Sequence, residues 1–529
     1  MKYQNDIIET ADAPLKKRND RCCCKNMNKP FYITTTLPYV NGLPHIGFAL
    51  EVVQADVIAR YQRLLGSDVV FNIGTDEHGV KIYEEAEKRR MTPQAFCDEM
   101  SEYFRSLKSL FDISYTDFIR TTDAHHTLAA QEFWRRCLAN GDIYKKQYQM
   151  KYCVGCELEK TDSELVDGKC ADHPNREIEI VEEENYFFRF SKFQDALLAL
   201  YGKDAGFVVP EKRLNEIRAF VERGPQDFSI SRLAKKMPWG IPVPDDAEHV
   251  MYVWFDALVN YISTLGWPSC AKASEGKPDH RCGMDSSESC RFVRFWPGVQ
   301  IAGKDNLRQQ SAMWQAMLLS AGVAPSAKIL IHGHITNAGQ KMSKSLGNVI
   351  APSELVEKFG IDGARYILLS AAAFGEDIDI TWERMSEKYN ADLANGLGNL
   401  TSRLIKLSER MEHGAWSMEQ ETGNMKQGSW SREKDTYPEE LKKLMDEYKM
   451  TEALEWIIAR TRVLDKKIAE VKPWELAKTD MEKFETEMKG FLEELSFIAS
   501  ALHPFLPQTS EKILKALRES KTEPLFQRI

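Results

Sequence analysis

The order of apolar patterns near the start of the chain restricts its fold more than any other feature. The run from Phe31 to Thr36 predicts a strand, and after a turn at Asn41–Gly42 apolar residues recur at helical spacing up to about Arg63. A second apolar run, Val69 to Ile73, follows. Strands joined through a helix pair in parallel, so we expect a Rossmann-like α/β sheet whose ligands bind at the carboxyl ends of its strands.

Strand signals return much later, in the segments VMYVWFDAL, VQIAGKDNL and AKILIHGHI. We interpret all three as parallel strands of the same sheet. Between the two sets lie helical segments expected from about 93 to 140 and a cysteine-bearing segment from 151 to about 190. We therefore expect an insertion that splits one sheet domain into two halves. From Met385 onward the pattern is helical, apart from a polar linker at about 415–438.

Composition excludes several classes of protein. No apolar run approaches the ~18–20 residues that span a bilayer, so no membrane role is indicated. The formal net charge of -9 requires any nucleic acid to be held by local Lys and Arg clusters. The first 29 residues mix acids and bases, unlike a targeting peptide, and predict a disordered tail. Eleven cysteines without a signal peptide favour a cytoplasmic protein with reduced thiols.

Four residues of the insertion have the spacing of a zinc knuckle. Cys153 and Cys156 are followed, after thirteen residues, by Cys170 and His173. Such a set leaves no open position on the metal, so a bound Zn²⁺ would be structural; the alternative is a group of buried free cysteines. The irregular spacing of Cys270, His280, Cys282 and Cys290 predicts a surface loop instead.

Two further segments carry phosphate chemistry. LPYVNGLPHIGF, at Leu37–Phe48, lies where the first strand gives way to a helix, so His45 is placed to reach a phosphate or to cap the helix. KMSKS follows the last strand, and its Lys341 and Lys344 could hold a triphosphate as pyrophosphate leaves. A solvated basic loop is the alternative for the second segment.

Together, HIG and KMSKS are the paired signature of class I aminoacyl-tRNA synthetases, which this sequence resembles. The segments LPYVNGLPHIG, GTDEHG, YVWFDAL, GKDNLR and KMSKS occur in the order found in methionyl-tRNA synthetases, and the resemblance runs from about Lys29 to Trp474. Leucyl, isoleucyl and valyl enzymes share the ATP motifs but usually carry a large editing insertion. The length of 529 residues therefore favours methionine.

The resemblance implies roles for individual residues. His45, Lys341 and Lys344 would be catalytic, and ATP, with Mg²⁺, would contact His45, Gly47, Glu51, Lys341, Ser343 and Lys344. Methionine would contact Leu37, Tyr39, Asp76, Trp254, Ala257, Tyr261, Asn306 and Gln310. Three positions depart from the family: Phe48 replaces a second histidine, and Gln310 and Asn306 stand where many members have histidine and isoleucine.

The helical region resembles the part of the family that reads the anticodon. A leucine stripe, which includes Leu400 and Leu404, places Asn399 and Arg403 together beside it. The resemblance aligns these two residues, and the aromatic Trp474, with anticodon-binding positions. Stacking of an unpaired base on an aromatic ring, beside amide and guanidinium donors, is a common way to read RNA.

We expect a methionine–tRNA ligase that acts on ATP, L-methionine and tRNA(Met), and a monomer. The alternatives are a noncatalytic tRNA-binding paralogue and a class I synthetase for another apolar amino acid. The expected regions are a disordered tail (1–29), two halves of the catalytic domain (30–142 and 231–325), a connective insertion with the zinc knuckle (143–230), a KMSKS-loop and stem-contact region (326–385) and an α-helical anticodon-binding bundle (386–529).

Overall fold

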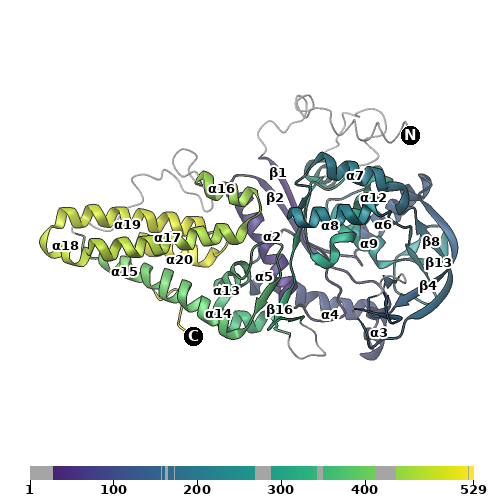
Figure 1. The fold of residues 1–529 in the computed structure, drawn as a ribbon, viewed down its shortest axis with the longest axis horizontal. Coiled ribbons are helices and arrows are strands. Elements are labelled where there is room, and N and C mark those ends of the chain that lie inside the picture. Colours follow the sequence, from purple (N-terminus) through teal and green to yellow (C-terminus); the bar gives the residue numbers. More distant parts are fainter. Residues whose placement is uncertain are drawn as a thin grey trace, which may run out of the picture.

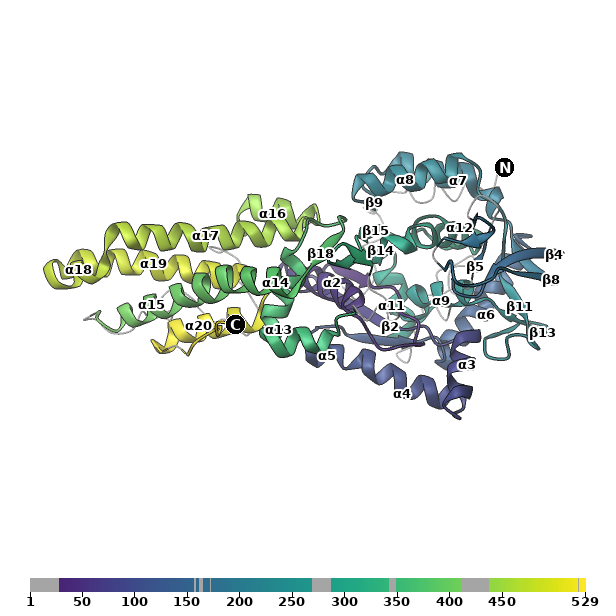
Figure 2. The same cartoon turned by 60° about the horizontal axis from the view of Figure 1, so that its bottom comes forward.

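The computed structural model describes residues 28–156, 158–160, 165–171, 173–268, 287–341, 349–411, 437–521 and 523–529. The molecule is elongated, with a body of sheets and helices at one end and a bundle of long helices at the other (Figures 1 and 2). None of the helices in these residues is both long and apolar enough to cross a membrane.

A six-stranded sheet forms the centre of the body, and every neighbouring pair of its strands is parallel. This confirms the expected Rossmann-like core. The chain winds outward in opposite directions from β1 and from β14, which lie side by side. In sheet order the strands are β3 (Asp117–Arg120), β2 (Asp68–Thr75), β1 (Pro30–Thr34), β14 (Val299–Gly303), β15 (Lys328–His332) and β9 (Val208–Val209).

Successive residues of a strand point to opposite sides of the sheet, and here both sets are apolar. Helices therefore cover both faces. Ile33 and Ile301 join one apolar core, with α2 and α4, whereas Tyr32 and Ala302 join a second core, with α6 and α12. The helices of the first half are α2 (Ile46–Leu64), α3 (Val80–Lys88), α4 (Pro93–Arg105), α5 (Leu107–Leu110) and α6 (Ala124–Ala139).

Helix α2 lies inside the molecule. Every residue from Phe48 to Ala59 is buried, including the polar side chains of Glu51, Gln54 and Asp56. A helix surrounded by protein on all sides cannot show the one-sided apolar stripe of a surface helix. Its buried acids therefore need partners, and those of Glu51 and Asp56 are described below.

The insertion is built on a long antiparallel hairpin, β4 paired with β8, at the end of the body farthest from the bundle (Figure 1). Its elements are β4 (Ile143–Cys153), β5 (Leu158–Glu159), β6 (Leu165–Val166), β7 (Lys169–Cys170), β8 (Glu179–Phe188), the 3₁₀ helix η3 (Phe190–Phe193), α7 (Gln194–Lys203), α8 (Glu211–Glu222) and β10 (Phe228–Ser229).

Two local predictions were wrong. In VMYVWFDAL the strand is antiparallel and lies in a small sheet of order β11-β13-β12, and VWFDAL is helical. The span 93–140 also contains β3, which is too short to show a period in the sequence. The elements here are β11 (Ser231–Leu233), β12 (Pro242–Val243), β13 (Asp246–Met251), α9 (Val253–Leu258), α10 (Asn260–Ser263), α11 (Ser287–Phe295), the 3₁₀ turn η5 (Lys304–Asn306), the π-helix η6 (Gln309–Met313) and α12 (Trp314–Ser320).

The region after β15 leads into the bundle through a small sheet and helix α13, which leaves the helical conformation at Gly360 (φ 71°). Its elements are β16 (Ile335–Asn337), β17 (Gln340–Lys341), α13 (Pro352–Ser370) and β18 (Ile378–Ile380). The bundle comprises α14 (Trp382–Tyr389), the π-helix η8 (Asn390–Gly398), α15 (Asn399–Ser408), α16 (Glu439–Asp446), α17 (Met450–Val471), α18 (Pro473–Thr479), α19 (Met481–Leu502) and α20 (Pro507–Glu519).

Candidate active site and metal centre

The carboxyl ends of neighbouring parallel strands gather most of the predicted substrate residues. The segment after β1 carries Leu37, Tyr39 and His45, the residue after β2 is Asp76, and Asn306 and Gln310 follow β14. The sheet changes its winding direction between β1 and β14. Ligands of open parallel sheets bind in the crevice at such a switch point, so the topology brings segments from distant parts of the sequence to one edge.

His45 is the N-cap of α2. Its backbone is extended (φ -117°, ψ 167°), and its Nδ1 accepts a hydrogen bond from the backbone N–H of Gly47 at 3.0 Å. A Cβ on Gly47 would lie 2.9 Å from the imidazole, so a glycine is needed for this ring position. The first turn of α2 contains no acidic residue. The exposed imidazole and the amide end of the helix together suit an anionic ligand.

Phe48 belongs to the apolar core. It is buried, and its ring packs edge-to-face on Phe104 of α4 with 5.9 Å between centroids. Burial of a phenylalanine against another ring stabilises the packing of α2 on α4. The departure from the second histidine therefore coincides with an apolar contact within the fold.

Glu51 of α2 connects this helix to the ends of β1 and β15 at the edge of the site. One carboxylate oxygen accepts hydrogen bonds from the N–H and hydroxyl of Thr36, at 2.7 and 2.6 Å, and the other lies 3.0 Å from Nε2 of His332 at the end of β15. Burial alone lowers the pKa of His332, but the hydrogen bond and charge of Glu51 raise it above its usual value. Glu51 thus holds the ends of β1 and β15 against α2.

The chain after β1 is bridged to the end of β2. Asp76 donates its backbone N–H to Pro38 at 3.0 Å and accepts one from Val40 at 3.2 Å, so Tyr39 and Asp76 are paired residues. Gly79 has φ 118°, and a Cβ there would lie 2.1 Å from the Tyr39 hydroxyl. The structure therefore brings Tyr39 and the buried Asp76 together. Gly79 leaves the space that the Tyr39 hydroxyl occupies.

The predicted side-chain pocket is built by α9, α10 and the π-helix η6. Tyr261 is buried, and its hydroxyl accepts a hydrogen bond of 2.7 Å from Nε2 of Gln310. Burial raises the pKa of Tyr261, so the phenol is neutral. Trp254 is half-buried and Ala257 is buried on α9. The bond between Tyr261 and Gln310 is a pairing that the sequence did not predict.

A buried polar chain behind this pocket was also missed. Asp256 accepts from Nδ1 of His78 at 2.9 Å, and its other oxygen lies 3.9 Å from Nε2 of His126, whose Nδ1 is 2.9 Å from the Ser263 hydroxyl. Burial raises the pKa of Asp256, but the two histidines lower it overall. His78 and Asp256 lie inside GTDEHG and VWFDAL, so these motifs held the signal. This buried polar network fixes the segments that carry Asp76 and Ala257.

The four predicted metal ligands converge. The ligand atoms of Cys153, Cys156, Cys170 and His173 all lie within 4.8 Å of one another. The Sγ atoms of Cys156 and Cys170 lie 3.4 Å apart, and Nδ1 of His173 lies 3.2 Å from Sγ of Cys156 and 3.9 Å from Sγ of Cys153. Around a tetrahedral Zn²⁺ these donors lie about 3.4–3.8 Å apart, close to the observed 3.2–3.9 Å, so three thiolates and one imidazole fit a structural zinc site.

The knuckle is packed closely and is attached to the site edge. A Cβ on Gly155 would lie 2.4 Å from the His173 ring, so only glycine permits that ring position. Nζ of Lys81, on α3, donates to the Gly155 carbonyl at 2.8 Å. Helix α3 begins directly after Gly79 and therefore links the knuckle to the segment that carries Asp76.

The predicted anticodon residues lie on the bundle. Asn399 is exposed at the start of α15, and Arg403 forms an ion pair with Asp465 of α17. Trp474 is half-buried on α18. The leucine stripe is buried throughout, which confirms that it forms the core beside these residues; its members are Leu393, Leu397, Leu400, Leu404 and Leu407.

Several predictions fall outside the described residues. They concern Ser343, Lys344 and the side chain of Lys341, the cysteines and histidine of the predicted loop at 269–286, Cys290 beyond its helical backbone, and the tail before Asn28.

Comparisons with known proteins are consistent with this site. The family "tRNA synthetases class I (M)" matches residues 31–178 and 163–405. Methionine–tRNA ligase of Rickettsia typhi is 38% identical, with 95% of this chain and 96% of the relative covered. That of Thermotoga maritima is 40% identical, with 92% and 75% covered.

Solved structures agree. The Mycobacterium tuberculosis methionyl-tRNA synthetase in complex with methionyl-adenylate has a TM-score of 0.81 and 36% identity, with 92% of this chain and 93% of the other covered. The ligand-free form of that enzyme has a TM-score of 0.75 and 32% identity, with 93% and 92% covered. The family model, the relatives and the solved structures lead to one conclusion: this chain belongs to the methionyl-tRNA synthetases of class I.

Proposed function

We propose that the protein activates L-methionine with ATP as methionyl-adenylate and transfers the methionyl group to tRNA(Met). The observation that carries this proposal is the switch point of the parallel sheet: the His45 helix start and Asp76 follow the neighbouring strands β1 and β2, and the hydrogen-bonded Tyr261–Gln310 pair is joined to β1 through the hydroxyl of Tyr32. Membership of the family supplies the reaction, and the relative with the matching fold binds methionyl-adenylate.

In the first step the methionine carboxylate attacks the α-phosphate of ATP, and the bond to the β-phosphate breaks. Negative charge grows on the departing pyrophosphate, so cations and amide dipoles that face it accelerate the step. His45, Gly47 and the amide end of α2 supply the described part of this site. Lys341, Ser343 and Lys344 would hold the phosphates from KMSKS, and Mg²⁺ bound with ATP would neutralise further charge.

The resemblance places Glu51 among the ATP-binding residues. We propose an indirect role for it instead. Its carboxylate is already occupied by Thr36 and His332. Because it is buried and fully engaged, we assign it to holding the ends of β1 and β15 at α2. The alignment of His45 with the substrate would then depend on Glu51, since most of catalysis by this class of enzyme is positioning.

Methionine would lie between the strand ends and α9. Asp76 is placed to pair with the substrate ammonium, and Leu37, Tyr39, Trp254 and Ala257 offer apolar surface to the thioether chain. Tyr261 accepts a hydrogen bond from Gln310, so its own O–H is available to donate to sulfur. We therefore interpret Gln310 as orienting the phenol and Asn306 as a variable neighbour.

In the second step the terminal ribose 2′-hydroxyl of tRNA attacks the adenylate carbonyl and AMP leaves. No side chain has to become covalently bound. Asn399, Arg403 and Trp474 would read the anticodon, at a distance from the reacting atoms (Figure 1). We propose a structural role for zinc in the knuckle, because all four ligand positions are supplied by the protein.

The expected boundaries at residues 30, 143, 231, 326 and 386 form part of the same proposal, as do a cytoplasmic location and a monomeric state. The three knuckle cysteines must stay reduced to bind a metal, which supports a reducing compartment. Light scattering at micromolar concentration tests the monomer, for which a mass near 60.6 kDa is expected.

The decisive experiment is pyrophosphate exchange into ATP with purified protein and each of the twenty amino acids. Exchange with methionine alone, followed by methionylation of tRNA(Met), is the expected result. Exchange with a different apolar amino acid would show a class I synthetase of other specificity, for which Asn306 and Gln310 would be the first positions to test. Tight tRNA binding without exchange would show a noncatalytic tRNA-binding paralogue.

A further inference from the structure

Arg365, on the second part of α13, is buried completely, yet its guanidinium is well supplied with acceptors. Nε donates to the Phe505 carbonyl at 2.7 Å and Nη2 to the Pro504 carbonyl at 3.1 Å. Nη1 donates to the Phe111 carbonyl at 3.0 Å and lies 2.8 Å from the Asp56 carboxylate. A planar fork of fixed geometry thus contacts three separate segments at once.

These segments belong to different parts of the molecule. Pro504 and Phe505 form the turn between α19 and α20 of the bundle, whereas Asp56 lies on α2 of the parallel-sheet body. Asp56 also accepts hydrogen bonds from the N–H and hydroxyl of Ser114, at 2.7 and 2.6 Å, and pairs with Arg60 at 2.8 Å. We call Arg365, Asp56 and the two turn carbonyls the junction cluster.

The junction cluster lies between the two functional ends of the protein. Helices α17 and α19 are each 22 residues long, or about 33 Å, and run from α18 to this junction (Figures 1 and 2). In the other direction, Asp56 is eleven residues along α2 from His45, a distance of about 16 Å. Both connections are continuous helices, so a small rotation at the junction becomes a displacement of several Å at the bundle tip.

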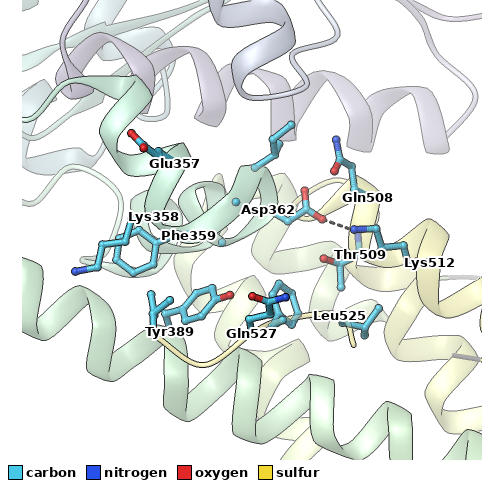
Figure 3. Close-up of a pocket in the computed structure, with 15 residues that line it drawn as sticks. Glu357, Lys358, Phe359, Asp362, Tyr389, Gln508, Thr509, Lys512, Leu525 and Gln527 are labelled. Carbon is cyan, nitrogen blue, oxygen red and sulfur yellow. Dashed lines mark hydrogen bonds between the residues drawn. The ribbon is translucent and has the colours of Figure 1, made fainter. Parts of the chain in front are cut away.

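A second contact supports the same joint. Asp362 of α13 accepts a hydrogen bond from the Thr509 N–H of α20 at 2.5 Å, and burial raises the pKa of Asp362. Figure 3 shows this bond at the wall of a pocket of about 280 Å³, between α13, α20 and the last residues of the chain. This second contact borders a cavity, whereas Arg365 in the junction cluster is completely enclosed.

We propose that Arg365 is a positioning residue for transfer: through Asp56 and the two turn carbonyls it fixes the bundle relative to α2, so that a tRNA held on the bundle presents its acceptor end to the adenylate. This inference rests on the proposed function. Activation takes place in the body, among the strand ends, α2, α9, α10 and the KMSKS segment, whereas transfer also needs the bundle in register. Arg365 should therefore matter for transfer far more than for activation.

The test uses Arg365→Lys in the full chain. Lysine can keep the charge pair with Asp56, but it cannot donate to the carbonyls of Phe111, Pro504 and Phe505 at the same time. Three quantities are measured: methionine-dependent pyrophosphate exchange, tRNA(Met) affinity, and single-turnover transfer from preformed enzyme-bound adenylate at saturating tRNA. Transfer should fall roughly 30-fold, because small misplacements cost up to about 100-fold, while exchange and affinity change by less than about 3-fold.

Arg60→Gln is the matched control. Arg60 also pairs with Asp56, but its other hydrogen bond, to the Asp112 carbonyl, stays within the sheet body, and toward the bundle it acts only through its charge, on His503. This variant should leave the ratio of transfer to exchange at the wild-type value. Equal losses of exchange and transfer in Arg365→Lys, or the same loss of transfer in Arg60→Gln, would overturn the proposal and leave a merely structural cluster.

A second variant keeps the test decisive if Arg365→Lys does not fold. Asp56→Asn preserves shape and the bonds to the turn carbonyls but removes the charge that anchors Arg365 to α2. Transfer should again fall more than exchange, and a parallel fall of both would contradict the proposal. Wild-type protein without methionine-dependent exchange would instead refute the proposed function, so the two failures are distinguishable.

Discussion

The sheet body and the helical bundle differ in what they bury. At the strand ends the interior holds acids paired with histidines, such as Glu51 with His332 and Asp256 with His78. The buried residues of α19 are all apolar. Burying a charge is costly unless it is paired and hydrogen-bonded, so the body tolerates that cost where groups must be held in place. Helix α19 thus contributes only hydrocarbon to the bundle core, where the buried acid Asp392 is paired with Arg462 and Tyr366.

The largest effect should come from breaking a buried pair in the body. Glu51→Ala leaves His332 and the Thr36 donors without their acceptor. Removal of one partner of a buried ion pair costs about 3–5 kcal/mol, so exchange should fall ~100-fold or more while tRNA affinity is retained. Urea unfolding and pyrophosphate exchange measure the two effects. Glu84→Ala, at an exposed position on α3, is the control, and equal effects from both would contradict the role.

A cavity in the bundle should produce the opposite result. Leu495→Ala on α19 removes a fully buried side chain and should cost about 3 kcal/mol of stability without changing exchange. Circular dichroism monitors the loss of helix in urea and gives the free energy of unfolding. Glu493→Ala, on the exposed side of the same helix, should be nearly neutral. A loss of exchange at temperatures where Leu495→Ala is folded would show that the bundle core contributes to activation.

Recognition at the bundle surface should have a smaller effect and act on a different reaction. Trp474→Ala should weaken tRNA charging by roughly 10- to 100-fold, the value of one base stacked on an aromatic ring, and leave exchange unchanged. Trp456→Ala is the matched control, because Trp456 packs against Phe497 within the bundle. If both variants lost charging to the same extent, Trp474 would be a packing residue.

The smallest effect concerns two histidines whose pKa values shift in opposite directions. Burial lowers the pKa of His332, but Glu51 more than compensates, so the pKa is higher in the folded protein than in the unfolded chain. The stabilising contribution of His332 is therefore complete below about pH 6.5 and is lost as the pH rises through the pKa of the folded state. Burial, with the charges of Arg60 and Arg365, lowers the pKa of His503 to about 4, so stability is lost as the pH falls from about 6.5 toward that value.

Each histidine should therefore contribute at most about 1.4 kcal/mol per pH unit, on opposite sides of neutrality. The measurement is the free energy of unfolding in urea between pH 5 and 8.5. His332→Gln should flatten the curve on the alkaline side, and His503→Gln should flatten it on the acidic side. The same change in slope from both variants would show that the two regions do not titrate differently.

Local patterns in the sequence were sufficient for the core of the fold. Phe31–Thr36, the helix ending near Arg63 and Val69–Ile73 predicted β1, α2 and β2, and the knuckle spacing predicted the clustering of its four ligands. These predictions worked because each signal lies within a few residues along the chain. The same holds for the leucine stripe, whose spacing placed it in the bundle core.

Signals that join distant positions could not be read in this way. Glu51 and His332 are 281 residues apart, and Arg365 and Phe505 are 140 apart, with nothing local to mark either as a pair. The antiparallel β13 was mistaken for a parallel strand, because an apolar run that continues into VWFDAL does not distinguish a strand followed by a helix from one long strand. Pairing partners depend on topology, which the sequence pattern leaves open.

The burial of α2 has a consequence for redesign. One helix carries the cap at His45, the brace at Glu51 and the anchor at Asp56, and every residue from Phe48 to Ala59 is enclosed. A change of side-chain size at one of these positions would disturb the packing that serves the other two. Attempts to alter amino-acid preference, or to develop selective inhibitors, should therefore avoid this helix and begin with the segment from Lys304 to Asn306, none of whose residues is buried.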